Sequence, residues 1–345
     1  MTPKQSYDPL LPDGPPEELL ASLREAKRPL IIGHENPDGD ALGSALALGL
    51  ALQSPGRSIS VGYSGTFSKC LEFLVKGKGI LSYVPFSPEL GKKHDLLVLV
   101  DCLDPFRVWV EAENCPPGSL PPHVCVDHHA NHYPSHHLAS YINHQAAATA
   151  ELVFKVIEAL GAEFTPSIVE ALLAALISDT GSFSQGNATS ECLRQASFLV
   201  SKGGDIENIN HYLKRNWSQT RMRLLVATLG TIALHHGDRV ATMLLTQETL
   251  NQTGSCLAEA EGLVDYPLLL QGVDLVAFFK VNGAGKTRVS LRGRPGVNVR
   301  DLADAMGGGG HRQASAYLDD SPDPAVAMAR ALPLLERLIV QENTN

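Results

Sequence analysis

The chain has 345 residues, 44% of them hydrophobic, and a formal net charge of −9 at pH 7. This length accommodates two domains of ordinary size, each with its own core. The negative charge disfavours nonspecific binding of long nucleic acid, which requires clustered Lys and Arg. The sequence has no Cys-x-x-Cys pair, no signal-peptide pattern and no apolar run long enough to cross a membrane. We therefore expect a cytoplasmic protein with no disulfide framework.

The first polar loop that follows an apolar strand carries a group of candidate metal ligands. Residues 16–27 have the apolar spacing of a helix, and residues 29–33 are typical of a short buried strand. The loop 34–44 then runs into a predicted helix at 45–52. Open α/β sheets bind ligands at the carboxyl ends of their strands. An Asp-Gly-Asp segment by itself more often caps a helix. Here the imidazole of His34 accompanies the carboxylates of Asp38 and Asp40. Together these three side chains suit Mn²⁺ or Mg²⁺.

Three further apolar segments predict strands, at 58–63, 95–100 and 123–126, with a helix expected at 67–75. The segment 95–100 is almost wholly aliphatic, which is typical of a parallel strand covered on both faces. Strands that alternate with helices predict a Rossmann-like parallel sheet with helices on both faces, and thus an α/β fold. Polar residues follow two of these strands. Asp101 follows the segment 95–100, and Asp127, His128 and His129 follow the segment 123–126.

Two helices are predicted at 146–160 and 166–177, and the second leads directly to Asp179. We expect Asp179, at a helix end, to face the same cleft as Asp101. The preceding segment 132–144 is rich in His. We interpret it as a solvent-exposed loop rather than as a second metal site, although it contains His132, His136 and His137.

The rest of the chain predicts a connector and a second α/β domain. Residues 190–234 have helical patterns, which suit either a connector or packing helices of the first domain. We predict a first domain at 1–195, a helical linker at 196–235 and a second domain at 236–345. In the second domain, strands are expected at 239–245, 273–281 and 287–291, helices at 257–270 and 298–305, and a hairpin-like turn at 282–285.

The sign of the charge changes in the second domain. The stretch 280–312 contains seven Lys or Arg against two Asp. Four consecutive glycines at 307–310 precede His311 within it. Such a run permits close approach of the backbone to an anion, although many glycine runs are simply flexible loops. A basic surface of this kind would suit a phosphorylated ligand.

Taken in order, these segments resemble the four motifs of the DHH phosphoesterase superfamily. The matching residues are His34-x-x-x-Asp38-x-Asp40, Asp101 after an aliphatic strand, Asp127-His128-His129, and Asp179 in a Ser-Asp-Thr-Gly context. In the second domain, Ser290-Leu291-Arg292 and the glycine run before His311 resemble the associated C-terminal domain of that superfamily. The resemblance implies a Rossmann-like catalytic domain and a smaller α/β domain, with the active site in the cleft between them.

The resemblance also implies a dinuclear site for Mn²⁺, with Mg²⁺ or Co²⁺ as alternatives. One metal would be held by His34, Asp38 and Asp101, and the other by Asp40, Asp101, His128 and Asp179. Asp127 would orient His128, and His129 would face the substrate phosphate. The predicted substrate-binding residues of the second domain are Arg292, Gly308, Gly309, Gly310 and His311.

The implied activity is hydrolysis of phosphoesters. The chain most resembles the bifunctional oligoribonuclease and pAp phosphatase group, which implies cleavage of RNA of about two to five nucleotides to 5′-mononucleotides and removal of the 3′-phosphate of pAp. Two cations would activate a hydroxide for attack on phosphorus. Two alternatives are a phosphodiesterase of cyclic dinucleotides or their linear products, and a non-catalytic nucleotide-binding regulator. The sequence leaves open whether the chain forms a homodimer.

Overall fold

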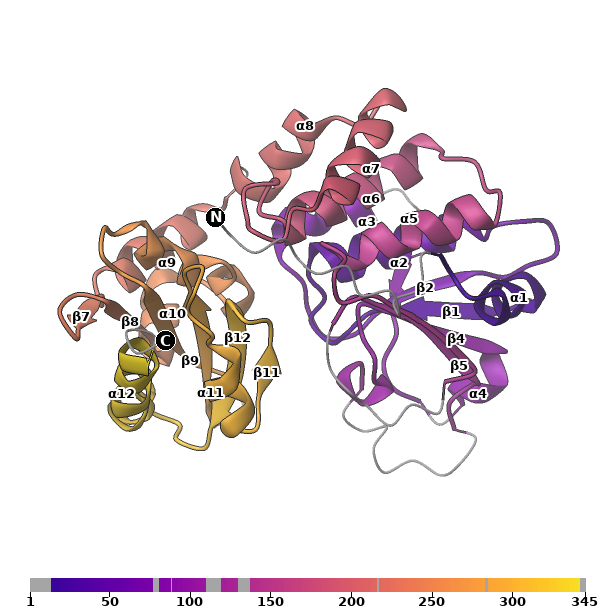
Figure 1. The fold of residues 1–345 in the computed structure, drawn as a ribbon. Helices are drawn as coiled ribbons and strands as arrows, with labels where there is room; N and C mark the ends of the chain where they lie inside the picture. Colours follow the sequence, from indigo (N-terminus) through magenta and orange to yellow (C-terminus); the bar gives the residue numbers. More distant parts are fainter. Residues whose placement is uncertain are drawn as a thin grey trace. The chain divides into compact units, whose positions relative to one another are not determined.

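The computed structural model describes residues 14–76, 81–87, 89–109, 119–129, 137–215, 217–282 and 285–341. The chain forms two compact units, Met1–Asn216 and Trp217–Asn345 (Figure 1). Among the helices described, none combines the length and the apolar character needed to cross a bilayer.

The first unit is built on a parallel sheet with the strand order β3-β2-β1-β4-β5-β6. This is the strand order of a doubly wound dinucleotide-binding fold. The order in which strands are added to the sheet reverses between β1 and β4. The prediction of a Rossmann-like α/β domain is confirmed. β3 and β6 escaped prediction because they are short and carry no long apolar run. The strands are β1 (Pro29–Ile32), β2 (Ser60–Tyr63), β3 (Leu81–Tyr83), β4 (Leu96–Val100), β5 (His123–Asp127) and β6 (Ala139–Ile142).

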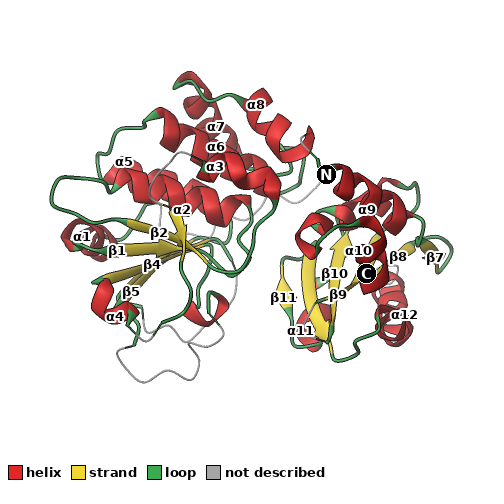
Figure 2. Ribbon diagram, turned by 180° about the vertical axis from the view of Figure 1, so that it is seen from behind, coloured by secondary structure: helices red, strands yellow, loops and turns green. Residues whose placement is uncertain are grey.

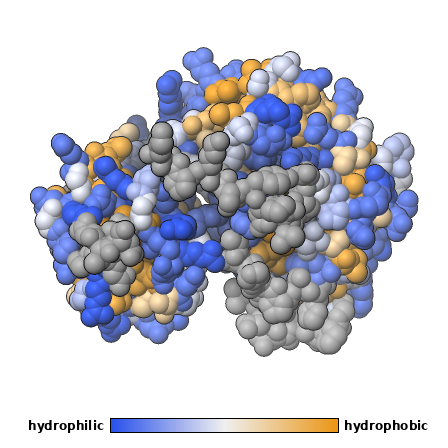
Figure 3. Space-filling model, in the orientation of Figure 1, coloured by the Kyte–Doolittle hydropathy of each residue, from blue (hydrophilic) through white to orange (hydrophobic). Residues whose placement is uncertain are grey.

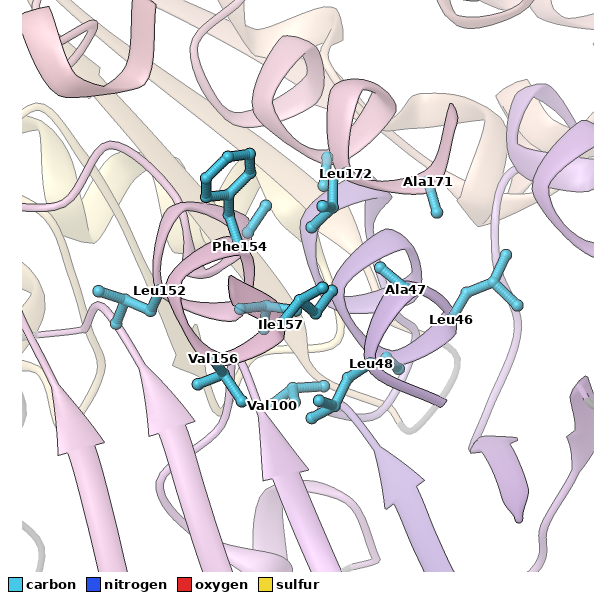
Figure 4. Packing of buried hydrophobic residues seen from close by; sticks show 14 of the residues in the cluster. Leu46, Ala47, Leu48, Val100, Leu152, Phe154, Val156, Ile157, Ala171 and Leu172 are labelled. Atoms are coloured by element: carbon cyan, nitrogen blue, oxygen red, sulfur yellow. The ribbon is translucent and has the colours of Figure 1, made fainter. Parts of the chain in front are cut away.

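Two helices lie directly over this sheet, α2 (Gly39–Ala51) and α5 (Thr149–Ala159), and α6 (Pro166–Asp179) packs on them from outside. Figure 4 shows α2 and α5 side by side above the strands, with α6 on their far side. The sheet covers one face of α2 and α6 covers the opposite face. Burial on both faces explains why α2 consists mostly of Ala, Leu and Gly. A Cβ at Gly43 would lie 2.5 Å from the carbonyl oxygen of Ala171, so glycine permits the close approach of α2 to α6.

Shorter helices complete the first unit. They are α1 (Glu17–Glu25), η1 (Lys69–Leu71), α3 (Glu72–Val75), α4 (Leu90–Lys93), η2 (Pro105–Arg107), α7 (Ser190–Ser201), α8 (Ile206–Asn210) and the π-helical turn η4 (His211–Arg215).

The second unit contains a mixed sheet with the order β11-β12-β10-β9-β8-β7. β8 and β9 are parallel, whereas the other neighbouring pairs are antiparallel. The smaller α/β unit predicted from the sequence is thereby confirmed. The strands are β7 (Ala233–His235), β8 (Val240–Leu245), β9 (Leu275–Val281), β10 (Thr287–Gly293), β11 (Gly309–Gly310) and β12 (Ala314–Asp319).

Each face of this second sheet packs against its own helices (Figure 2). One face carries Phe279 and Leu291 against α11 (Arg300–Ala305) and α12 (Pro324–Gln341), and α12 was not predicted. The other face carries Met243 and Phe278. It is covered by α9 (Gln219–Leu229), α10 (Gln247–Thr253), η5 (Leu257–Ala260) and η6 (Leu263–Leu269).

The stretch 196–235 contributes to both units. The end of α7, then α8 and η4, belong to the first unit, whereas α9 and β7 belong to the second. The helix expected to continue to residue 234 ends at Leu229, and the chain then enters β7. Glycine at position 230, a poor helix former, follows directly.

Hydrophilic side chains dominate the face of the molecule seen in Figure 3, with smaller apolar areas on both units. The most exposed large apolar side chains in the described ranges are Leu269 at 80% and Val226 at 66%. They come from different elements, η6 and α9. Scattered apolar residues of this kind are normal on globular proteins.

Candidate metal centre and active site

The predicted ligands of the first unit come together at the carboxyl ends of β1, β4 and β5. The loop after β1 supplies His34 and Asp38, and the first turn of α2 supplies Asp40. Asp101 directly follows β4, and the histidine pair directly follows β5. This is the point at which the strand order reverses, where doubly wound sheets bind ligands. The residues brought together are His34, Asp38, Asp40, Asp101, Asp127, His128, His129 and Asp179.

The first group of potential ligands consists of His34, Asp38 and Asp101. The Nε2 atom of His34 lies 3.6 Å from Oδ2 of Asp101 and 3.9 Å from Oδ1 of Asp38. Its Nδ1 lies 2.9 Å from the carbonyl oxygen of Glu35, which makes Nδ1–H the donor and directs Nε2 toward the carboxylates. One imidazole nitrogen and two carboxylate oxygens within 4.8 Å of one another can share a divalent cation.

The second group consists of Asp40, His128 and Asp179. The Nε2 atom of His128 lies 3.7 Å from Oδ2 of Asp179 and 4.0 Å from Oδ2 of Asp40. Its Nδ1 lies 3.2 Å from the carbonyl oxygen of Ala146, so this ring is also oriented by a main-chain acceptor. His128 Nε2 is 3.5 Å from Oδ1 of Asp101. The two oxygens of Asp101 therefore face different histidines.

Asp101 adopts a left-handed backbone conformation, with φ of 57°. Such a conformation costs about 1–3 kcal/mol for a residue other than glycine and persists only where the surroundings hold it. The carboxylate is 2% exposed, and Oδ1 accepts a hydrogen bond of 2.9 Å from the hydroxyl of Thr149. The conformation and this hydrogen bond aim the carboxylate between His34 and His128.

Asp40 has a structural function as well as a place in the second group. Its carboxylate accepts hydrogen bonds from the main-chain N–H groups of Thr149 (2.6 Å) and Ala150 (3.0 Å), at the start of α5. The N-cap residue of α5 is Ala148, which has no side-chain acceptor. Asp40 therefore caps α5 from another part of the chain.

Asp127 contacts His129 and not His128, which corrects the expectation that it orients His128. Its Oδ1 accepts from the ring Nδ1 of His129 at 2.7 Å and from the main-chain N–H of His129 at 3.0 Å. The ring of His128 turns toward Ala146 instead, and the two imidazole planes are 73° apart. Asp127 Oδ2 is buried and has no hydrogen-bond partner among the described residues.

The carboxylates raise the pKa values of two histidines. Burial lowers the pKa of His34, but the hydrogen bond to Asp101 and the charges of Asp38 and Asp101 outweigh burial and raise it to about 9. Burial likewise opposes protonation of His129, yet Asp101 and Asp127 raise its pKa to about 10. Without a metal, both imidazoles therefore hold protons at neutral pH.

The pKa values of the two buried carboxylates, Asp101 and Asp40, shift in opposite directions. Burial favours neutral Asp101, but the imidazoles of His129, His34 and His128 hold its pKa below the ordinary range. Burial raises the pKa of Asp40, and the charges of Asp101 and Asp179 raise it further. Several buried carboxylates so close together need cationic partners.

The donor chemistry of the two groups fits hard divalent cations. Carboxylate oxygens and imidazole nitrogens suit Mn²⁺ and Mg²⁺, whereas thiolates would favour softer metals. Two buried cysteines lie nearby, but burial raises the pKa of Cys102 to about 12 and raises that of Cys125 as well. The Cys102 thiol donates to the carbonyl oxygen of Asp104 at 3.0 Å. Both cysteines therefore remain protonated packing residues.

In the second unit, Arg292 lies on β10 and is partly committed to internal contacts. Its Nε donates to Oδ1 of Asp265 at 2.9 Å, and its Nη1 donates to the carbonyl oxygen of Leu291 at 3.1 Å. Its side chain is 26% exposed. The guanidinium is therefore held in place while part of it still reaches solvent.

The glycine run packs its backbone against β12. A Cβ at Gly308 would collide with the carbonyl oxygen of Ala316, and one at Gly310 would lie 2.5 Å from that of Ala314. The N–H of Gly308 donates to the carbonyl oxygen of Ala303 at 2.7 Å, so this N–H is not directed at a ligand. Gly309 pairs with Ala316. His311 follows in an exposed position.

Comparisons with known proteins identify the family. The DHH family N-terminal domain matches residues 28–177, and the DHHA1 domain matches residues 253–325. The bifunctional oligoribonuclease and PAP phosphatase NrnA of Thermus thermophilus is 30% identical over 295 residues, which cover 85% of each chain. This chain belongs to the DHH phosphoesterase family. It is accordingly a hydrolase of phosphoester bonds, and DHH phosphoesterases depend on metal ions.

Other relatives extend this result. The cyclic-di-AMP phosphodiesterase GdpP of Geobacillus thermodenitrificans is 29% identical over 324 residues, which cover 88% of this chain and 46% of GdpP. The crystal structure of an exopolyphosphatase-related protein from Bacteroides fragilis superposes with a TM-score of 0.82 at 25% identity. That match covers 95% of this chain and 99% of the solved one. Both matches extend over the DHH and DHHA1 regions.

Several residues that support the DHH site were missed by the sequence analysis. Thr149 binds Asp101, as described above. The side-chain amide of Asn187 donates to the carbonyl oxygens of Asp179 (3.0 Å) and Ala147 (3.1 Å), which joins the end of α6 to the turn before α5. Glu151 accepts from the N–H of Ala147 at 3.1 Å. The only available signal was the Ala-rich stretch before α5, which lacks a capping side chain of its own.

The His-rich loop lies partly outside the described residues, as do His132 and His136. His137 is described. Its Nε2 lies 2.9 Å from the carbonyl oxygen of Leu103, and its ring packs edge-on against that of His123. His137 thus has a packing role.

Proposed function

We propose that this enzyme hydrolyses RNA oligonucleotides of about two to five nucleotides to 5′-mononucleotides, and that it also removes the 3′-phosphate of pAp. The observation that carries the proposal is the arrangement of five carboxylate and imidazole side chains around Asp101, which are those of His34, Asp38, Asp40, His128 and Asp179. The similarity to a bifunctional oligoribonuclease and PAP phosphatase over 85% of both chains supports this substrate class.

The proposed ligand sets follow the two groups. His34, Asp38 and Asp101 would hold one divalent cation, which we propose is Mn²⁺. Asp40, Asp101, His128 and Asp179 would hold the other. When bound, the cations would acidify a water molecule and neutralise charge on the phosphoryl oxygens. Asp101 offers one oxygen to each group, and the main-chain contacts of His34 and His128 keep each Nε2 turned toward the cation sites.

We assign to His129 the stabilisation of charge on the phosphate. Its Nδ1–H is held by Asp127, which fixes the plane of the ring. In the metal-free enzyme, the charges of Asp101 and Asp127 outweigh burial and raise the pKa of this ring to about 10, which favours its protonated form. Its remaining N–H can then donate to a nonbridging oxygen of the phosphate, where negative charge increases during the reaction. Asp127 acts on the chemistry through His129.

We further propose that the DHHA1 unit binds the rest of the substrate through Arg292 and His311. The close packing of Gly308, Gly309 and Gly310 against β12 fixes the main chain that leads into His311. In this proposal the glycines set the backbone conformation, and the side chains of Arg292 and His311 provide the polar contacts.

The test is hydrolysis of a 5′-labelled RNA dinucleotide in Mn²⁺, with excess chelator as the control, beside pAp and a cyclic dinucleotide. We expect rapid Mn²⁺-dependent release of mononucleotide from the dinucleotide and release of phosphate from pAp. Absence of both reactions, in enzyme that binds Mn²⁺, would contradict the proposed substrate class.

A second candidate function is cleavage of cyclic dinucleotides. The similarity to GdpP over 88% of this chain favours it. Opening of the cyclic dinucleotide with no release of mononucleotide from the linear RNA would establish this alternative. The non-catalytic alternative receives no support, because every predicted ligand position in the first unit carries a carboxylate or an imidazole.

A further inference from the structure

Asp179 occupies a place where the helix that carries it does not stabilise a carboxylate. It is the last residue of α6, and a negative charge is unfavourable at the C-terminus of a helix. The last turn of α6 contains no basic residue that would offset this charge. Asp179 is also the most exposed member of the second ligand group, with a side chain that is 26% exposed against 1% for Asp40 and 4% for His128. Its position therefore depends on contacts from outside α6.

The turn that follows α6 has an unusual backbone. Gly181, Ser182 and Phe183 all adopt left-handed conformations, with φ of 57°, 63° and 63°. Such a conformation is costly for a residue other than glycine and persists only where the surroundings hold it. The N–H of Ser182 donates to the carbonyl oxygen of Ile177 at 2.8 Å. The N–H of Phe183 donates to the hydroxyl of Thr180 at 3.0 Å. These two hydrogen bonds fold the turn back against the end of α6.

A second segment holds this turn from outside. It consists of α8 and the π-helical turn η4, residues 206–215, and we call it the α8–η4 segment. The ammonium group of Lys214 donates to the carbonyl oxygen of Gly181 at 3.3 Å. The side-chain oxygen of Asn210 accepts a hydrogen bond from the hydroxyl of Ser182. Lys214 thus supplies, at the C-terminal end of α6, the positive charge that the last turn of α6 lacks.

The α8–η4 segment is itself anchored in the first unit. The ring of Tyr212 stacks on that of Phe73, with centroids 4.7 Å apart and planes 10° from parallel. Leu213 packs against the apolar core, and α8 packs against α6. π-Helical turns are rare and frequently mark functional regions. The segment is therefore a fixed part of the first unit, and it can hold the turn after α6 in place.

We propose that Lys214 and Asn210 are positioning residues for the second cation site, because they fix the turn that sets the direction of the Asp179 carboxylate. The inference assigns a role to residues outside the ligand sets, and it rests on the ligand sets of the proposed function. Loss of a group that supports a metal ligand lowers metal affinity by about 10- to 100-fold. The direct effect should be confined to the second group, since the first group takes no ligand from α6.

The test is calorimetric titration of Mn²⁺ into the chelator-treated full chain. We expect two binding steps, which Asp179→Asn and His34→Asn assign to the second and the first group. Lys214→Met should weaken the step assigned to Asp179 by about tenfold or more and leave the other step unchanged. Lys214→Arg keeps the charge and the donor, and it should retain the wild-type affinity. Lys202→Met is the matched control, because Lys202 is also exposed at a helix end, that of α7, which carries no proposed ligand.

A second pair of variants makes the test independent of the lysine charge. Asn210→Ala removes the acceptor for Ser182 and should weaken the same step, whereas Asn210→Asp keeps an acceptor oxygen and should retain the affinity. Wild-type affinities in Lys214→Met and Asn210→Ala would overturn the proposal, as would equal weakening of both steps, which indicates general loosening of the unit. If Asp179→Asn loses neither step, the proposed ligand set fails together with this inference. If Asp179→Asn loses a step that Lys214→Met and Asn210→Ala leave unchanged, only the positioning role fails.

Discussion

The two units concentrate opposite charges and stabilise them in different ways. In the first unit, buried carboxylates accept hydrogen bonds from the chain itself, as Asp40 does at the start of α5 and Asp101 does from Thr149. In the second unit, the cationic Arg292 is instead held by the carboxylate of Asp265 and by the main-chain carbonyl oxygen of Leu291. The acidic site is therefore positioned before any cation binds.

The largest effect should come from Asp101→Asn. This change removes the negative charge from the one carboxylate whose two oxygens face His34 and His128 separately. We expect hydrolysis of an RNA dinucleotide at saturating Mn²⁺ to fall by about a thousandfold or more, or by more than about 4 kcal/mol in transition-state stabilisation. The number of bound Mn²⁺ ions should fall too. Near-normal activity would refute the shared-ligand arrangement.

Asp95→Asn is the matched control for this change. Asp95 directly precedes β4, at the opposite end of the same strand, where it accepts hydrogen bonds from the main-chain N–H groups of Lys27 and Arg28. Its loss should lower stability slightly and leave kcat close to that of the wild type. A large loss of activity in both variants would point to general damage of the sheet instead.

A second effect concerns pH. His34, with a pKa raised to about 9, is protonated at neutral pH and must lose its proton to bind a cation. Mn²⁺ affinity should therefore rise with pH up to about 9, by about tenfold per unit for each proton displaced. Calorimetry in buffers of different ionisation enthalpy would count the released protons. A His34→Asn variant should release fewer, and an affinity independent of pH would contradict the assignment.

The metal-free enzyme should show the opposite trend in stability. The folded-state pKa values of His34 and His129 are raised above the ordinary value of 6.5, to about 9 and about 10. Their contribution to stability is thus complete below about pH 6.5 and is lost as the pH rises through these values. Thermal unfolding with chelator, measured across this window, should show a falling Tm. Mn²⁺ should suppress the fall, because the cation replaces the lost protons.

The sequence predicted the parts of the site that depend on the order of the strands. Apolar runs before Asp101 and Asp127 identified two central strands, and parallel strands deliver their carboxyl ends to one edge. It could not predict that Asp127 would form its hydrogen bond with His129. That pairing depends on the ring of His128 turning to the carbonyl oxygen of Ala146 instead. It also could not predict the burial of Lys280, which depends on the elements that cover one face of the second sheet.

Thr149 offers the finest test of how the chain positions its own carboxylates. The Thr149→Val change keeps the shape of the side chain but removes the hydroxyl that binds Oδ1 of Asp101, in a position with 0% exposure. Loss of one buried hydrogen bond to a charged group costs about 1.5–3 kcal/mol, so Mn²⁺ affinity should fall by about tenfold or more. Thr149→Ser retains the hydroxyl and should restore most of this affinity. Equal affinities in the Val and Ser variants would mean that Thr149 only packs at the start of α5. A loss confined to the Val variant would mean that the hydroxyl holds Asp101 in its strained conformation, and that the acidic site is set by the chain before the metal arrives.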